Sequence, residues 1–481
     1  MKKRKKDEID NERKIKNLKF NENILVHSEF LPINVEEIYT NVNTNSWFDI
    51  QKYKSLTKHK NIKSDTKIKS EKLEKCIKIK MIPTKIQKDI LQSWFIAHTD
   101  MYNEGVKFIK HNFDILKNDI TFDILINELN KKKKNSFDNS YYLRSQLLNK
   151  KKIIQDNSQL KQTEENTKIQ THILDYALRQ LCSNIKSAKT NLLRGNIKKF
   201  RIKYWSHNRS SKTIDIEKQY IKENKICYKI LGDIKYYNNG HIHNLQNIDR
   251  GIKINYNKIT DEYFLLIPEK TETKIINNKT ENIISLDPGL RTFMTGVSSM
   301  GMTKIGNNVN KIIATKINRI NNIKNNPEIS IKIKKKNEIM INRKISNKID
   351  DLQWKSINYL VKNYKTIYLG NMSAKNIVKK DSKILSNVQK VACLRTKYYQ
   401  FNQRLEYKSK LYGVKFKVID ESYTSKTCSN CCFYDKQLGG AKIYNCIVCD
   451  LSIDRDLNGA RNIFFTPFYI SNAYFLIIAA V

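Results

Sequence analysis

A predicted strand near the middle of the chain delivers a single carboxylate. The apolar run 282–286 leads into Asp287, and Pro288–Gly289 then turns the chain. A nuclease that depends on divalent metal ions needs such an acid on a rigid strand, because the ions that activate water and stabilise the leaving oxygen must be held at a fixed separation. Asp-Pro-Gly is also a common turn sequence, so this motif alone does not separate a metal ligand from a structural turn.

A second acidic motif lies close to the C-terminus, in the stretch 454–463. Asp454, Asp456 and Asn458 offer oxygen ligands at the start of a predicted helix, whose N-terminal amides also favour anions. Two structural alternatives are a helix N-cap paired with an arginine and an isolated calcium loop. The position of the glycine and the lack of a later acid argue against the calcium loop.

Four of the nine cysteines form two close pairs, and these pairs are the most specific signal in the chain. Cys428 and Cys431 are followed, after a gap of fourteen residues, by Cys446 and Cys449. Two Cys-x-x-Cys knuckles at this distance place four thiolates around one tetrahedral Zn²⁺. Four protein ligands close the site, so we expect the zinc to be structural. Cys432 is a spare thiol beside the first knuckle and could replace a ligand.

In this order, the three motifs resemble the C-terminal half of TnpB proteins. These are RNA-guided DNA endonucleases of mobile elements, often labelled transposases, and their eukaryotic and viral relatives are called Fanzor. The resemblance rests on Asp287–Gly289, Tyr423–Cys431 and Asp454–Ala460, and a strand and helix between Lys80 and Asn103 are similar as well. It covers residues 75–463 and is most specific over the last forty.

The resemblance implies a fold and a catalytic centre. The family combines an α/β RNase H-like (RuvC) catalytic domain carrying an inserted zinc ribbon with an α+β N-terminal lobe, made of a helical bundle and a β-barrel-like wedge. Guide RNA and DNA would be the partners, and Mg²⁺ would be the catalytic ion. Asp287 would be the first RuvC carboxylate and Asp456 the last.

One position departs from the family pattern. The family's second RuvC motif is a strand that ends in Glu-Asp-Leu, and the matching segment here, Ile367–Met372, has Gly370 in the place of the glutamate. Glycine cannot bind a metal ion, and two carboxylates alone would hold a pair of ions poorly. We expect Glu421, at the end of the strand predicted for 414–419, to supply the third ligand, because Fanzor proteins are similar in using a relocated glutamate. Alternatively, Asp420 or Glu421 is only a surface acid at the end of a strand.

Hydrophobic periodicity predicts the elements that must position these side chains. Strands are expected at 76–81, 226–228, 252–256, 263–267 and 414–418, and helices at 84–103, 174–192 and 391–412. Thr84 and Gln87 form a capping box at the start of the first helix, and Gly195 ends the second. After residue 281 strands alternate with helices, which is typical of an α/β domain.

The segment 198–205 interleaves basic and aromatic side chains. It contains Lys198, Lys199, Arg201, Lys203, Tyr204 and Trp205. Such a surface can pair with phosphates while it stacks on bases, so these residues are candidates for nucleic-acid binding. An ordinary amphipathic strand is the alternative.

The charge balance predicts a polyanionic partner. Lys and Arg number 89 against 47 Asp and Glu, which gives a formal net charge of +42. Each phosphate that such a protein neutralises releases counterions and adds affinity. The codon bias of an AT-rich genome would explain Lys over Arg, but it does not explain the shortage of acids.

The two ends of the chain carry signals of location. The cluster 2–6 could be a nuclear localisation signal or a solvated basic arm, and no signal peptide follows Met1. We therefore expect a reducing, intracellular location, nuclear or at sites of viral replication. The uncharged stretch Phe464–Val481 has about the minimum length for a membrane span. Because it contains Pro467, a packed C-terminal segment or a frameshifted tail is favoured over an anchor, and no membrane partner is expected.

The expected domain order follows from these patterns and from the resemblance. It comprises a basic, mostly disordered arm (1–70), a β-barrel-like wedge (71–105 and 196–280), a helical recognition domain (106–195), a RuvC-like nuclease domain (281–427 and 450–466), a zinc ribbon (428–449) and an apolar tail (467–481).

The expected function is RNA-guided, metal-dependent cleavage of DNA, with Asp287, Glu421 and Asp456 as the catalytic, Mg²⁺-binding acids. Two other functions remain open. One is a catalytically inactive, zinc-containing nucleic-acid-binding remnant that lost cleavage with Gly370. The other is a transposase that acts directly in strand transfer, although no Tyr or Ser recombinase constellation is apparent.

Overall fold

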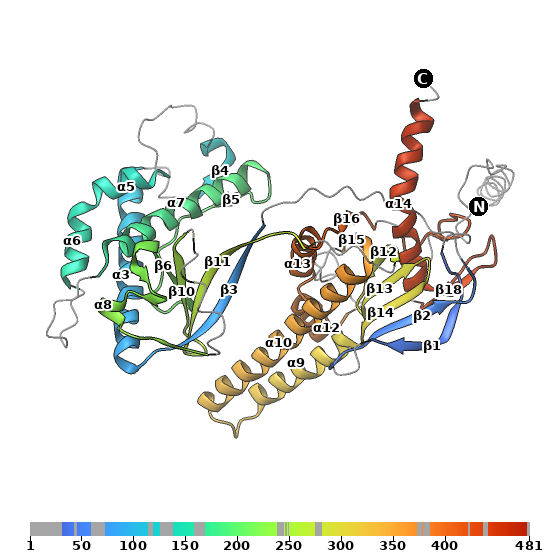
Figure 1. Cartoon of the computed structure of the whole chain (residues 1–481), viewed down its shortest axis with the longest axis horizontal. Coiled ribbons are helices and arrows are strands. Elements are labelled where there is room, and N and C mark those ends of the chain that lie inside the picture. The colour runs from blue at the N-terminus through green and yellow to red at the C-terminus, as the bar shows by residue number, and fades with distance from the viewer. Residues whose placement is uncertain are drawn as a thin grey trace. The chain divides into compact units, whose positions relative to one another are not determined.

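The computed structural model of the chain describes residues 31–42, 46–58, 73–113, 119–125, 138–157, 169–237, 245, 248, 250–274, 281–372, 378, 385–421, 424–435 and 441–478. It divides the chain into two compact units. We call residues 73–271 the central unit, and residues 1–72 together with 272–481 the split unit (Figure 1).

The split unit is built on a seven-stranded sheet. In spatial order its strands are β1 (Val35–Asn41), β2 (Ile50–Ser55), β14 (Gly301–Asn307), β13 (Thr292–Ser298), β12 (Glu281–Pro288), β15 (Tyr364–Gly370) and β16 (Lys415–Ile419). β12, β13 and β14 form an antiparallel meander, whereas β15 and β16 continue from β12 in parallel. Helices connect the parallel strands, so the expected α/β architecture is confirmed.

Five of the helices that the structure describes accompany this sheet. They are α9 (Val309–Asn325), α10 (Ile331–Asn363), α12 (Asn387–Arg395), α13 (Tyr398–Leu411) and α14 (Arg455–Ile478). Apolar side chains at helical spacing, such as Ile313 and Ile317 on α9 and Ile345 and Ile349 on α10, share one core with the sheet. The single helix expected over 391–412 is two helices, because Lys397 between them has a left-handed backbone (φ 54°).

Part of the N-terminal arm, which was predicted to be mostly disordered, forms two strands. β1 and β2 extend the sheet of the split unit, and β2 pairs with β14 through Tyr53 and Met302. Phe48 and Ile50 are buried in its core. The prediction for 1–70 is therefore wrong over these strands, and its remaining residues lie largely outside the described ones. Short strands with a mixture of polar and apolar residues give little periodicity, which is why composition was misleading there.

The central unit combines an open sheet with helices around one core. The sheet order is β6 (Ser211–Ile216), β10 (Ile252–Asn257), β11 (Glu262–Thr271), β3 (Leu73–Ile82) and β9 (Lys235–Tyr236). Its two long helices, α3 (Lys85–Asn112) and α7 (Thr171–Leu193), share that core. The capping box of Thr84 and Gln87 is confirmed at the start of α3. Because α3 runs across residue 105, the expected boundary between wedge and helical domain cuts a continuous helix.

Shorter elements complete the central unit. They are β4 (Ile120–Thr121), α5 (Ser140–Gln146), α6 (Leu148–Asn157), β5 (Lys199–Phe200), a 3₁₀ turn (Lys218–Tyr220), β7 (Ile221–Lys222), β8 (Lys225–Ile226) and α8 (Tyr228–Leu231). The strand expected at 226–228 is therefore only the end of β8 and the start of α8. Asp175 on α7 joins α5 and α6 to the long helix, because its carboxylate pairs with Arg144 at 2.7 Å and Lys151 at 2.6 Å.

The C-terminal stretch continues helix α14. Ile463 and Phe465 are fully buried against the sheet, so the start of this uncharged stretch is packed as expected. The side chains of residues 468–481 lie outside the described ones. Among the residues that the structure describes, no helix has both the length and the apolarity needed to cross a membrane.

Candidate metal-binding active site

Asp287 lies at the end of β12, where several contacts fix the backbone around it. Ser285, two residues earlier, donates a hydrogen bond through Oγ to the carbonyl oxygen of Ala460 on α14 (2.7 Å). The Tyr398 hydroxyl donates to the carbonyl oxygen of Gly289 in the turn that follows (2.6 Å). The Asp287 side chain is half-buried. The acid is therefore carried on a strand that is held on both sides, as a metal ligand requires.

Glu421 occupies the space that Gly370 leaves open. Gly370 ends β15 and pairs with Ile419 at the end of the neighbouring strand β16, two residues before Glu421. A β-carbon added to Gly370 would lie 2.7 Å from Oε2 of Glu421 and 3.1 Å from Cδ of Pro288, which follows Asp287. The Glu421 carboxylate therefore reaches over the strand end next to Asp287. Its Oε2 is buried and has no hydrogen-bond partner among the described residues.

Asp456 is the acid of the second motif that remains available. Asp454 caps α14 instead, because its Oδ1 accepts from the backbone N–H of Asp456 (2.9 Å) and its Oδ2 pairs with Lys304 (3.0 Å). The Asn458 side chain is fully buried and engaged at both ends in hydrogen bonds to the backbone. The structural alternative of an N-cap therefore describes Asp454 but not Asp456, and the paired cation is a lysine.

Gly459 allows α14 to approach β12 closely. A β-carbon at this position would lie 2.5 Å from Oδ2 of Asp287, which is well inside van der Waals contact. Only a residue without a side chain lets the helix pass beside this carboxylate. No local pattern indicated this role, because a glycine inside a helix is usually interpreted as destabilising.

The three carboxylates concentrate negative charge. Burial, followed by the charges of Glu421 and Asp456, raises the pKa of Asp287 well above its usual range. Burial, followed by the charge of Asp420, raises the pKa of Glu421 to about 7. Burial also raises the pKa of Asp456, while nearby cations such as Lys304 oppose this shift only in part. Half-buried acids, of which Asp287 is destabilised by the charges of the other two, are a fitting ligand set for hard divalent cations.

The four cysteines of the two knuckles meet as predicted. All four sulfurs lie within 4.8 Å of one another, and the Cys428–Cys449 and Cys431–Cys446 pairs are 3.6 Å and 3.5 Å apart. Zn–S bonds of about 2.3 Å in a tetrahedron place sulfurs about 3.8 Å apart, so the cluster could hold one zinc ion. Among the described residues, it is the one compact metal-ligand cluster of this kind. Cys432 is exposed and lies outside the cluster, so it does not replace a ligand.

Hydrogen bonds from α14 connect the cysteine cluster to the acids. Asn458 accepts from the backbone N–H of Ser429 (2.9 Å) and donates to the carbonyl of Thr427 (2.8 Å). Asn462, one turn later, donates to the carbonyls of Thr424 and Thr427, both at 2.7 Å. Thr424 in turn donates through its backbone N–H and Oγ1 to the carbonyl of Glu421. The helix that carries Asp456 thus also holds the segment that follows Glu421.

Replacing Asn462 with alanine should destabilise the split unit by about 1–3 kcal/mol, because the buried carbonyl of Thr424 would lose this donor and the half-buried carbonyl of Thr427 would retain the one from Asn458. Urea unfolding measures the loss of stability. Hydrogen exchange of the folded variant should show weaker protection of the amides in 424–429. Asn445→Ala removes an exposed asparagine from the neighbouring strand β17 (Ile443–Asn445) and serves as the control. Equal protection in both variants would mean that the Asn462 bonds contribute little. The four-residue spacing of Asn458 and Asn462 was the sequence signal for this shared face, and it was missed.

The basic–aromatic segment 198–205 is only partly suited to bind nucleic acid. Lys198 and Lys203 are exposed, whereas Lys199 and Arg201 share Asp119, at 2.7 Å and 2.9 Å. Tyr204 is exposed beneath the Lys110 ammonium group.

Trp205 is not available for stacking on a base. Its ring lies between Tyr102, with centroids 3.6 Å apart and planes nearly parallel, and the Arg209 guanidinium, 3.6 Å from its centroid. Both faces are therefore covered, and the prediction for Trp205 is wrong. Alternation of basic and aromatic residues does not distinguish an exposed ring from one that packs inside the fold.

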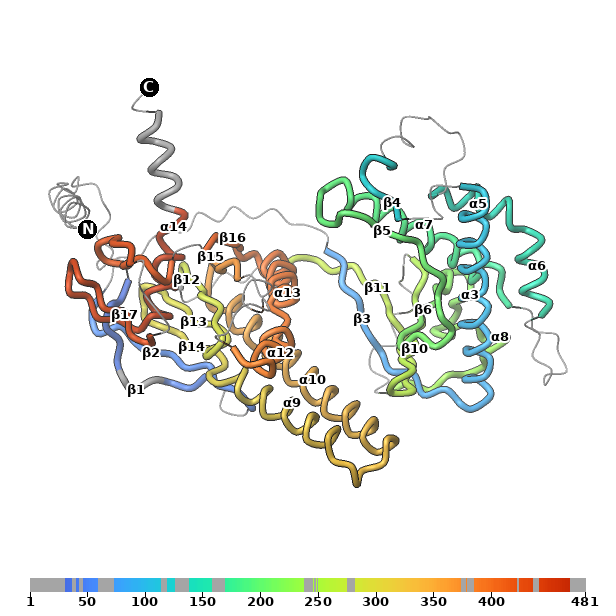
Figure 2. The backbone as a smooth tube through the Cα atoms, turned by 180° about the vertical axis from the view of Figure 1, so that it is seen from behind, coloured from blue at the N-terminus to red at the C-terminus, as the bar shows by residue number. Residues whose placement is uncertain are grey.

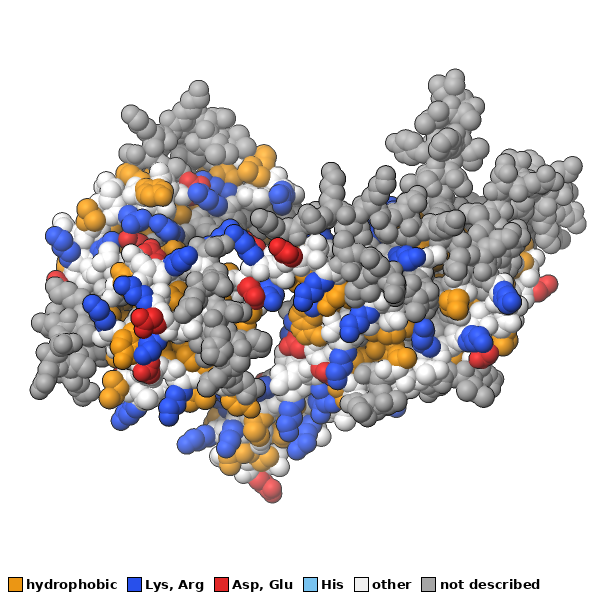
Figure 3. Space-filling model, viewed as in Figure 1, with side chains coloured by type: hydrophobic (Ala, Val, Ile, Leu, Met, Phe, Trp, Pro, Cys, Tyr) orange, Lys and Arg blue, Asp and Glu red, His pale blue; other side chains and the backbone are white. Residues whose placement is uncertain are grey.

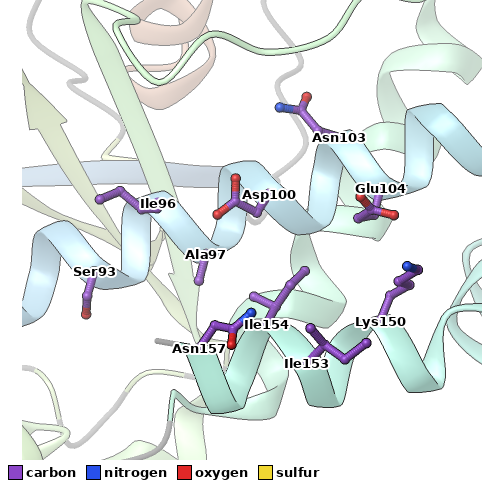
Figure 4. A pocket seen from close by; sticks show the side chains of 10 residues that line it. All are labelled: Ser93, Ile96, Ala97, Asp100, Asn103, Glu104, Lys150, Ile153, Ile154 and Asn157. Atoms are coloured by element: carbon purple, nitrogen blue, oxygen red, sulfur yellow. The ribbon is translucent and has the colours of Figure 1, made fainter. Parts of the chain in front are cut away.

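A pocket of about 550 Å³ lies elsewhere, between α3 and α6 of the central unit (Figure 4). Asp100 and Glu104 of α3 and Lys150 and Ile153 of α6 line it. Asp100 is paired with His207 at 3.0 Å. The pocket holds none of the candidate site residues, so the candidate chemistry remains at the end of the seven-stranded sheet.

Comparisons with known proteins give consistent matches. Residues 398–463 match the family model "Cas12f1-like, TNB domain". A TnpB-like protein of Acanthamoeba polyphaga mimivirus is 32% identical over 94% of this chain and 88% of its own length. A second TnpB-like protein of the same virus is 33% identical, over 88% of this chain and 82% of its own length.

Matches to a CRISPR-associated protein are more limited. The endodeoxyribonuclease Cas12f1 of Sulfoacidibacillus thermotolerans is 40% identical over 14% of this chain and 16% of its own. A cryo-EM structure of a Cas12f1–sgRNA–target DNA complex covers 81% of this chain and 98% of that chain at 16% identity. Its TM-score of 0.28 is too low to establish a shared fold.

Proposed function

Because this chain belongs to the TnpB-like family, we propose that it is an RNA-guided, Mg²⁺-dependent DNA endonuclease with a RuvC-like catalytic domain and an inserted structural zinc ribbon. The strand order of the split unit supports the RuvC-like assignment. A three-stranded antiparallel meander, β12 to β14, is followed by two strands parallel to β12, which is the arrangement that an RNase H-like sheet requires.

The placement of Glu421 is the observation that carries this proposal. The family's usual glutamate is absent at Gly370, and an inactive remnant would be expected to leave the position empty. Instead the Glu421 carboxylate lies over Gly370, within 2.7 Å of where a β-carbon would be. A buried carboxylate oxygen with no hydrogen-bond partner among the described residues is costly unless a cation compensates it, so a relocated metal ligand accounts for the position of Glu421.

In the proposed mechanism Asp287, Glu421 and Asp456 hold the divalent ions at the end of the sheet. Bound Mg²⁺ would polarise the scissile phosphate and lower the pKa of water, so no Ser or Cys nucleophile is required. Asp287 lies at the end of β12, Glu421 follows β16 on the other side of β15, and Asp456 lies on α14. Gly459 lets that helix pass close to the Asp287 carboxylate.

The zinc ribbon would have a structural role. Four thiolates close the coordination sphere, which leaves no open position for substrate. Burial raises the pKa of the Cys428 thiol to about 12, so a bound cation is needed to keep this ligand as a thiolate.

Guide RNA would supply sequence choice by base pairing, and the protein would read mainly the shape and backbone of the nucleic acids. The net charge of +42 supports polyanionic partners. Lys198, Lys199, Arg201, Lys203 and Tyr204 remain candidates for contact with them, whereas Trp205 does not.

The test is to purify the protein from cells that carry its native locus and to sequence the RNA that is bound to it. The expected result is one RNA species with a variable end, together with Mg²⁺-dependent cleavage of DNA that matches this end. A bound RNA without cleavage would instead support the catalytically inactive remnant. A strand-transfer product would support direct transposition.

A further inference from the structure

The hairpin of α9 and α10 projects beyond the catalytic end of the sheet. α10 ends where β15 begins, and Tyr364 pairs with Glu281 at the start of β12. Asp287 lies at the other end of β12. The 33 residues of α10 span about 50 Å, whereas the eight residues of β12 span about 26 Å. The first half of the helix therefore extends past the acids, and Figures 1 and 2 show the hairpin leaving the sheet.

This projecting part buries few side chains. We call residues 318–343, which comprise the end of α9, the turn and the start of α10, the basic arm. The first buried residue of α10 is Ile341, so the first ten residues of the helix bury none. A helical extension of this kind contributes little to the core of the split unit. Its residues are therefore not constrained by packing and are available to bind a partner.

The basic arm has an excess of positive charge. It contains seven Lys and Arg residues and two acids, and one of the acids, Glu338, pairs with Lys324 at 2.7 Å. Lys332, Lys335 and Lys336 are exposed and have no acidic partner among the described residues. Figure 3 shows Lys and Arg side chains along the hairpin. An ordinary solvent-exposed helix surface would be expected to contain more acidic residues, because pairs of opposite charge stabilise the helix.

The cations are arranged as a stripe on α10. Lys332, Lys336 and Arg343 follow one another at intervals of four and seven residues, so they lie on one face of the helix. They span about 16 Å along its axis. This length corresponds to about five nucleotides of one strand of a duplex, at about 3.4 Å each.

The start of α9, which leads to the basic arm, is fixed to the turn that follows Asp287. Asn310 on the first turn of α9 donates to the carbonyl of Leu290 (2.7 Å), and the N–H of Asn308 donates to the carbonyl of Arg291 (2.9 Å). The 17 residues of α9 then lead about 25 Å to the tip. The cations are thus held within one duplex turn of the acids, whatever the position of the central unit.

We propose that the basic arm binds the phosphate backbone of the DNA duplex that flanks the cleavage site. The choice of DNA rests on the proposed function, because the DNA strand is the ligand that must pass the acids. The arm recognises phosphates and not bases, so it adds affinity without sequence preference.

Salt-dependent binding tests this inference without cleavage. Lys332→Gln with Lys336→Gln should lower the slope of log affinity against log salt for a labelled DNA duplex by about one per lost contact, or about two in total. The purified full chain is used without Mg²⁺. Lys355→Gln with Lys362→Gln removes two exposed charges from the far end of the same helix, and this control should keep the parental slope.

Two outcomes would overturn the inference. Equal slopes for the two double variants would mean that the arm does not contact the DNA. A reduction confined to an RNA duplex would assign the arm to guide RNA. Because binding is measured and not cleavage, a chain that fails to cut DNA but shows the expected loss of slope would refute the proposed activity and leave the arm's assignment intact.

Discussion

Replacement of Glu421 by glutamine should reduce Mg²⁺-dependent DNA cleavage by at least about a hundredfold, with little loss of stability. Glutamine keeps the size of the side chain over Gly370 but removes the charge that binds the cation. Loss of residues that only support a metal ligand already costs 10- to 100-fold, so loss of a direct ligand should cost at least as much. Rates of single-turnover cleavage on a matched DNA, at saturating Mg²⁺, measure the effect.

The adjacent acid provides the control for this prediction. Asp420→Asn removes an equal charge from the neighbouring position, which is exposed, and should leave the rate within a fewfold of the parental value. If Glu421→Gln and Asp420→Asn cut equally well, Glu421 is a surface acid and the ligand assignment fails.

Moving the carboxylate back to position 370 tests the relocation itself. Glu421→Ala opens the space over the strand end, and the added substitution Gly370→Glu should then restore part of the lost rate. Recovery should be incomplete, because a β-carbon at Gly370 would also lie 2.9 Å from Cδ1 of Ile463. No recovery, in a double variant that still folds, would mean that the two positions are not equivalent.

Replacement of Cys446 by serine should remove zinc and lower cleavage by roughly a hundredfold, although the cysteines do not belong to the catalytic acids. Structural zinc contributes on the order of 10–16 kcal/mol in small zinc domains, and its loss should release the knuckles. The segment that Asn458 and Asn462 contact would then become mobile, and the acids near it would be displaced. Displacement of a catalytic group by about 1 Å can lower a rate about a hundredfold. Zinc content, amide exchange over 424–463 and cleavage rate should change together.

Cys432→Ser is the matched control, because this exposed thiol follows the first knuckle and lies outside the sulfur cluster. It should keep one zinc per chain and the parental rate. A Cys446→Ser protein that has lost its zinc but cleaves at the parental rate would show that the ribbon does not position the acids.

The parts of this fold that were predictable from sequence are those with a local signal. The two knuckles, the capping box of Thr84 and the strand that ends at Asp287 each have residues at fixed spacing. The position of Glu421 was inferred from the absence at Gly370, and the structure brings these two positions together. The acid's role itself remains a prediction.

What could not be predicted depends on long-range contacts. The strands β1 and β2 have little periodicity of their own; β2 gains its order from pairing with β14, about 250 residues later, and β1 pairs with β2. Trp205 is covered by Tyr102 and Arg209, which no local pattern indicates. The role of Gly459 arises only when α14 packs against β12, so it could not be read from spacing alone.

The split unit is assembled from both ends of the chain, and this has a consequence for biosynthesis. Arg461 donates from Nη1 to the carbonyls of Leu31 and Pro32, at 2.7 Å and 2.6 Å, and from Nε to Ser429. During translation the central unit can fold first, whereas the sheet that carries the acids must wait for α14 to leave the ribosome. A prematurely terminated chain would then retain a folded central unit but lack Asp456, the last acid of the proposed metal site.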